Sequence, residues 1–162
     1  MNDIILKSLV NTYSYEAYRT RLQRLLVEGK TSGDEQSEDL VHYSQLNETR
    51  MNRLDKTIEI TAEIQLFLAN LETEYIWLVL SEGWCGDAAQ IIPVVNKMAE
   101  LSDKVELKIV FRDENPELMD LFLTNGGKAI PKLILVEKNK LEMIADWGPR
   151  PAEAVRLIVD YK

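Results

Sequence analysis

This chain of 162 residues has only one cysteine and one histidine, Cys85 and His42. A single cysteine excludes an internal disulfide, and it also excludes any catalytic cycle that needs two thiols on the same chain. His42 has no cysteine or second histidine near it in the sequence, so we expect no metal site there. No run of about 18 apolar residues occurs, which excludes a membrane-spanning helix of ordinary length.

Positive charge is also in deficit. Lysine and arginine number 19 against 27 acidic residues, and the formal net charge is −8. Nucleic-acid binding needs a basic face, so the charge argues against it. The N-terminus has no basic region followed by an apolar stretch, and a lone cysteine is unusual in small secreted domains. We therefore expect a cytoplasmic protein that binds neither nucleic acid nor membrane; the oligomeric state stays open.

Hydrophobic residues make up 46% of the chain, enough for one domain with a substantial core. The first part of the chain has apolar residues at helical spacing. This spacing predicts an early helical stretch over residues 4–10 and helices over residues 14–28, 37–54 and 61–71. In the helix at 61–71 we expect the buried residues to be Ile64, Phe67, Leu68 and Leu71. The segment 57–60 is compatible with a short strand or a linker.

From residue 75 the pattern changes to strands alternating with helices. The sequence predicts strands at 75–80, 105–111, 132–136 and 141–147, and helices at 87–101, from 115 to Gly126, and from Pro151 to the end. We expect Pro93 to kink the helix that contains it or to start a new register there. The last helix should turn Ala154, Val155, Ile158 and Val159 inward. This order predicts an α/β fold with a mixed central sheet and helices on both faces.

The candidate site lies between the first strand and the following helix, at residues 81–90. An apolar strand, a glycine-containing turn and a helix place Cys85 at the first helical turn. Unpaired backbone N–H groups and the helix dipole favour a thiolate there, whereas Asp87, two residues away, opposes it. The sequence does not give the sign of the net pKa shift.

Four motifs in this region together resemble the thioredoxin family. They are Trp84-Cys85-Gly86-Asp87, Pro93 in the following helix, Asp113-Glu114-Asn115-Pro116 after the next strand, and Ala129-Ile130-Pro131-Lys132 before the third strand. The resemblance covers residues 61–162 and implies a thioredoxin-like fold. The sequence around the motifs is similar to that of a bacterial subgroup with a helical N-terminal extension. Residues 1–60 fit such an extension.

The resemblance also implies roles for individual residues. Pro131 is expected to be cis, leaving the backbone of Ile130 free to hold an extended substrate across Cys85. Trp84, Gly86 and Asp87 would border the same substrate.

The sequence departs from the family pattern at three positions. Ala88 occupies the position of the resolving cysteine, Val79 that of a buried aspartate, and Ile109 that of its lysine partner. The three losses are consistent with one another, since an aspartate–lysine pair that helps to deprotonate the second thiol has no role when that thiol is absent.

Two functions remain open at this stage. In the first, Cys85 is the nucleophile of a monothiol exchange protein that forms mixed disulfides with protein or low-molecular-weight thiols. In the second, Cys85 is an inert remnant and the fold is a non-catalytic module that binds a peptide or protein. The sequence Cys-Gly-Asp-Ala differs from the Cys-Gly-Phe-Ser with which monothiol glutaredoxins bind an iron–sulfur cluster, so we expect no cofactor. Trp84 and Trp147 are candidates either for the wall of a groove or for covering the core, whereas Trp77 is expected in the core.

Overall fold

The computed structural model describes residues 1–161. Within that range the elements are α1 (Asn2–Ser8), α2 (Tyr15–Val27), α3 (Glu38–Thr57), α4 (Ala62–Ala69), β1 (Tyr75–Ser81), α5 (Gly86–Glu100), β2 (Val105–Phe111), α6 (Pro116–Leu121), β3 (Lys132–Glu137), β4 (Glu142–Trp147) and α7 (Ala152–Tyr161). None of these helices is long and apolar enough to cross a membrane.

The four strands form one mixed sheet in the order β2-β1-β3-β4. β1 is parallel to β2 and antiparallel to β3, and β3 is antiparallel to β4. β1 therefore lies inside the sheet, and its run of apolar residues is covered from both sides: Val79 and Leu80 point to opposite faces and are 2% and 0% exposed. The α/β class and the mixed sheet predicted from the sequence are confirmed.

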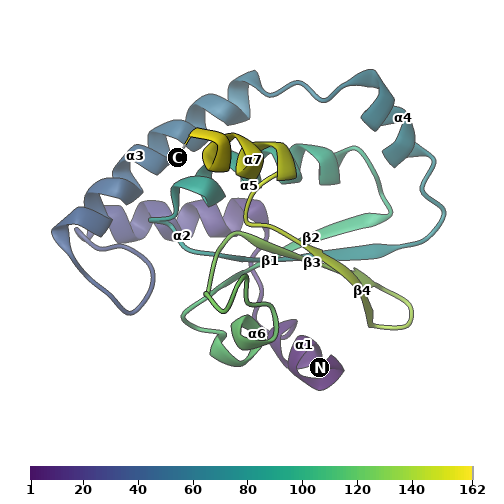
Figure 1. The fold of residues 1–162 in the computed structure, drawn as a ribbon, viewed down its shortest axis with the longest axis horizontal. Coiled ribbons are helices and arrows are strands. Elements are labelled where there is room, and N and C mark those ends of the chain that lie inside the picture. Colours follow the sequence, from purple (N-terminus) through teal and green to yellow (C-terminus); the bar gives the residue numbers. More distant parts are fainter. Residues whose placement is uncertain (162) are drawn as a thin grey trace.

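Helices cover both faces of the sheet (Figure 1). α2, α3 and α5 lie on one side, and α1 and α6 lie on the other. α3 packs against α5, and α1 packs against α6. Ahead of α2, Tyr13 forms an antiparallel bridge with Ile109, which pairs part of the open edge of β2.

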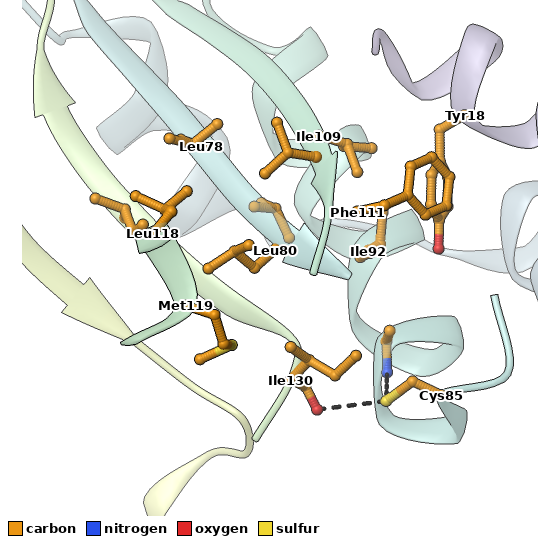
Figure 2. Packing of buried hydrophobic residues seen from close by; sticks show 14 of the residues in the cluster. Tyr18, Leu78, Leu80, Cys85, Ile92, Ile109, Phe111, Leu118, Met119 and Ile130 are labelled. Atoms are coloured by element: carbon orange, nitrogen blue, oxygen red, sulfur yellow. Dashed lines mark hydrogen bonds between the residues drawn. The ribbon is translucent and has the colours of Figure 1, made fainter. Parts of the chain in front are cut away.

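The core on the α2 side reaches the end of β1 (Figure 2). The ring of Tyr18 lies 5.5 Å from that of Phe111, and the Tyr18 hydroxyl is 2.9 Å from the hydroxyl of Ser81. Both side chains are buried, so this hydrogen bond satisfies two polar groups that are removed from water. The contact fixes α2 over the strand that leads to Cys85.

Several local expectations are wrong. In α4 only Leu68 is buried, and Phe67 is 68% exposed. α7 buries no residue, although its apolar residues recur at helical spacing. An apolar stripe predicts burial only where another layer packs closely on it, and neither helix is covered in that way.

Smaller differences concern helix ends and one tryptophan. α6 ends at Leu121, short of the glycines at 126 and 127, because residues 122–127 form a separate turn. Residues 58–60 are a linker. Trp77 is half-buried, whereas Val79 on the same face of β1 is buried, so cover on this face is complete only toward the end of the strand near Cys85. α5 runs through Pro93 as one helix.

Candidate active site around Cys85

Cys85 is the N-cap residue of α5 and is 9% exposed. Its Sγ accepts a hydrogen bond from the Ala88 N–H at 3.4 Å and donates one to the Ile130 carbonyl at 3.3 Å (Figure 2). Burial raises the pKa of the thiol, and the charge of Asp87 adds to this, whereas the N–H groups of Ala88 and Asp87 and the charge of Arg112 act in the opposite direction. The net direction is upward, so the resting form is the thiol and burial outweighs the helix N-terminus.

Ile130 and Pro131 precede β3 and are both buried. Their peptide bond is cis. Gly148, with φ of +122°, packs directly behind Pro131, and a Cβ on Gly148 would lie 2.2 Å from the Pro131 carbonyl oxygen. Only glycine combines that φ with so close an approach, so the end of β4 fixes the position of Pro131 next to the thiol. The Ile130 carbonyl, expected from the resemblance to be free for a substrate, is occupied here by the Cys85 thiol.

An open groove of about 580 Å³ lies beside the thiol. It is lined by Leu40, Tyr43 and Arg50 of α3, by residues Trp84 to Asp87, and by Gln90 and Arg150. The volume is within the range of small-molecule sites, roughly 300–1,000 Å³. The thiol is therefore reachable from solvent through a groove with one wall formed by the N-terminal part of the chain.

Two arginines face this groove in different electrostatic settings. The Nε of Arg150 donates to the Asp87 carboxylate at 2.8 Å, so each neutralises the other. Arg50 donates to the Oδ1 of Asn47 at 3.0 Å, and it forms no ion pair within residues 1–161. A Cβ on Gly86 would lie 3.5 Å from the Arg50 Nη1, so the absence of a side chain at Gly86 leaves the guanidinium close to the first turn of α5.

A buried carboxyl group, Glu82, lies under the turn that carries Cys85. It is 0% exposed and accepts hydrogen bonds from the Ser32 hydroxyl and, at 2.9 Å, from the Asp113 N–H. Ser32 in turn accepts the Gly83 N–H at 2.8 Å. Burial raises the pKa of Glu82, and these two hydrogen bonds partly offset the effect. The network ties the loop before α3 to the ends of β1 and β2.

Further contacts complete this attachment. Asn47 of α3, 0% exposed, donates to the Gly83 carbonyl at 3.0 Å. The Asp113 carboxylate accepts the Asp34 N–H at 2.9 Å and the Arg112 Nε–H at 2.8 Å. Burial alone would raise the pKa of Asp113, but these two donors bring it below its usual value. The guanidinium of Arg112 also lies 4.9 Å from the centre of the Trp84 ring, which holds that ring at the groove.

The structure brings most of the predicted site residues together. Trp84, Cys85, Gly86 and Asp87 line the groove, and Ile130 contacts the thiol. Trp84 also packs against the core cluster. Trp147 is 37% exposed and does not line the groove.

Where the family's second thiol and acid/base pair would stand, the structure has only apolar side chains. Ala88 is 1% exposed, and Val79 and Ile109 are paired neighbours in β1 and β2, both buried. Among residues 1–161, the buried side-chain nitrogen and oxygen atoms without a hydrogen-bond partner belong to Arg19, Glu48 and Thr124, not to these positions.

Sequence reasoning missed Arg50, Arg150, Glu82 and Asn47. One signal was present, because Asn47 interrupts the apolar stripe of its helix at Leu40, Tyr43, Met51 and Leu54. A polar residue in such a stripe is buried only with hydrogen-bond partners. Within the described residues, no group of three or more histidine, cysteine or acidic side chains is placed to hold a metal ion.

A central β1-α5-β2 unit, an antiparallel β3-β4 hairpin and a cysteine at the N-cap of α5 beside a cis proline define a thioredoxin-like protein with a single thiol at its site. A sequence model of the thioredoxin family matches residues 33–162, and the chain belongs to that family. The match includes α3 as well as the sheet.

Two solved structures have the same fold. A protein of unknown function from Pseudomonas aeruginosa, PA1234, superposes with a TM-score of 0.60 at 15% identity, covering 92% of this chain and 87% of its own. An HIV epitope-scaffold superposes with a TM-score of 0.59 at 16% identity, covering 86% of each chain. No curated protein matches the chain.

Proposed function

We propose that the protein performs monothiol thiol–disulfide exchange at Cys85 in the cytoplasm. The observation that carries the proposal is the position of Sγ, which caps α5 within hydrogen-bond reach of the Ala88 N–H and lines an open groove. An N–H donor at this distance stabilises the negative charge that develops on sulfur. Membership of the thioredoxin family supports this chemistry, and the absence of a second cysteine limits it to one thiol.

The exchange needs no group beyond a disulfide and a second thiol. Cys85 loses its proton, now shared with the Ile130 carbonyl, to solvent, and the thiolate attacks one sulfur of a disulfide R–S–S–R. A Cys85–S–S–R bond forms, the original S–S bond breaks, and RS⁻ leaves and takes a proton from water. An external thiol attacks the mixed disulfide in the same way and restores Cys85. The number of disulfide bonds is unchanged in each step.

The direct test uses a neutral reagent, 2-hydroxyethyl disulfide, and intact-protein mass spectrometry. We expect one adduct on the wild type and none on Cys85→Ser, and we expect a small thiol to reverse it. A folded wild-type protein that forms no adduct while the same protein reacts in denaturant would overturn the proposal.

The pH dependence of alkylation gives a second measurement. Because burial raises the pKa of Cys85, the rate should rise with pH through a midpoint above about 8.5, the value of a free cysteine. The denatured protein should react with the unshifted midpoint. A midpoint below that of the denatured chain would show that the helix N-terminus outweighs burial.

One observation favours a second function, a non-catalytic binding module. The thiol donates to the Ile130 carbonyl and is held in its protonated form, as expected of a packed residue rather than a nucleophile. In that case a ligand would bind equally well to the wild type and to Cys85→Ala. Loss of binding in Cys85→Ala would favour a covalent mode.

A further inference from the structure

We infer that the groove beside Cys85 binds small sulfur compounds that carry a carboxylate, and that Arg50 binds the carboxylate. The covalent use of such a compound depends on the exchange function proposed above. Binding itself depends only on the groove and is tested separately.

The charges of the groove carry the inference. Asp87 is the one acidic residue among the lining side chains, and Arg150 neutralises it at 2.8 Å. Arg50 keeps its positive charge, since within the described residues its side chain has only the amide oxygen of Asn47 as a partner. In a chain of net charge −8, a guanidinium without an ion pair is unusual in a groove whose one carboxylate, that of Asp87, is already paired with Arg150. The remaining N–H groups of Arg50 match a carboxylate in a two-pronged geometry.

The position of Arg50 also limits the size of the ligand. The guanidinium lies against Gly86, the residue after Cys85, so a carboxylate bound there is only a few atoms from a sulfur at Cys85. The groove volume of about 580 Å³ suits a small molecule. Asn47, buried and also bonded to the Gly83 carbonyl, fixes Arg50 relative to the cysteine turn, so the distance from the charge to the thiol is set by the fold.

The binding test uses 3,3′-thiodipropionate, a thioether dicarboxylate that cannot exchange with a thiol, and its neutral diamide. Binding is followed by NMR through the Trp84 indole N–H and the Arg50 Nε–H. We expect the dicarboxylate to shift both signals and the diamide to bind about tenfold more weakly, the size expected for one charge-assisted contact. Inorganic phosphate binding as well as the dicarboxylate would overturn the inference in favour of a general anion site.

Two variants separate Arg50 from overall charge. Arg50→Gln should abolish the tenfold preference, whereas Arg53→Gln, an equal charge change on an exposed residue of the same helix that does not line the groove, should keep it. Arg50→Lys retains a donor for Asn47 and a charge but not the planar pair of donors, so it should keep part of the preference. The NMR spectrum of Arg50→Gln itself shows whether that variant is folded. Equal binding by the wild type and a folded Arg50→Gln would overturn the inference.

Exchange rates then connect the groove to the chemistry. We measure exchange rates with three disulfides: anionic 3,3′-dithiodipropionate, neutral 2-hydroxyethyl disulfide and cationic cystamine. Each rate is divided by the rate of the same reagent with a cysteine peptide. The anionic reagent should be favoured by about tenfold in the wild type but not in Arg50→Gln. The net charge of the protein favours cationic cystamine at long range, so an anionic preference must come from the groove. Reaction with all three reagents without preference overturns the inference and leaves the exchange function standing. Carboxylate binding without any reaction overturns the exchange function and leaves the binding site standing.

Discussion

α3 and the segment that leads into α7 both reach the groove at Cys85, from opposite ends of the chain. α3 buries Ser44, Asn47 and Met51, and Asn47 reaches the turn before the cysteine. α7 buries nothing, and it follows a segment attached to the site through the ion pair between Arg150 and Asp87, whose side chains are 41% and 34% exposed. Surface ion pairs contribute about 0–1 kcal/mol, whereas a buried hydrogen-bonded group is costly to disrupt.

This difference shows how the two ends of the chain are used. The N-terminal side is part of the structure around the candidate site, because buried polar groups fix its position relative to Cys85. The segment before the C-terminal helix contributes Arg150 to the groove, but the helix itself buries no side chain, so its position depends little on the core. Three changes test the contrast, in order of decreasing effect.

The largest effect is expected from Glu82→Ala. It leaves the Ser32 hydroxyl and the Asp113 N–H without their acceptor in a buried space, so unfolding free energy should fall by about 3 kcal/mol. Denaturant titration measures it. Glu82→Gln is the matched control, since its amide keeps the shape and an acceptor, and it should cost much less. If alanine and glutamine were equally mild, the network would not hold the N-terminal side in place.

An intermediate effect is expected from pH. The pKa of Glu82 is raised in the fold, so its contribution to stability is complete below its unfolded value of about 4.3 and is lost as pH rises through the folded pKa. The unfolding free energy of the wild type minus that of Glu82→Gln should therefore decrease as the pH rises over that range. Taking the difference removes the opposite contribution of Glu106, whose pKa is lowered by Lys108 and Lys138 and which is not among the groups that shift Glu82. A flat difference would show that burial does not act on Glu82.

The smallest effect is expected from ending the chain at Pro151. Because α7 buries no side chain, the unfolding free energy should change by less than about 1 kcal/mol. Removal of the exposed Leu157 and Val159, 71% and 66% exposed, should not harm solubility. A loss as large as that of Glu82→Ala, dependent on protein concentration, would show that a second molecule covers this helix.

The order of elements from residue 75 was predictable, because a strand buried on both faces and an amphipathic helix leave strong local patterns. Cys85, its place at the start of α5 and the lack of a second thiol followed from the same stretch. The exposure of the apolar residues of α4 and α7 was not predictable. An apolar stripe shows which face of a helix is suited to packing, not whether another element covers that face. Glu82 was missed for a related reason: its partners, Ser32 and Asp113, lie 50 and 31 residues away.

The sequence by itself determined that one thiol stands at a strand-to-helix junction and that no second thiol can resolve its disulfides. These are properties of residue identity and of local spacing. Only the tertiary structure decided that burial raises the pKa of the thiol, that its groove has α3 as a wall, and that Arg50 forms no ion pair with any residue from 1 to 161. Burial, ion pairing and hydrogen bonding depend on distances between residues far apart in the chain, and those distances are set by how the layers pack.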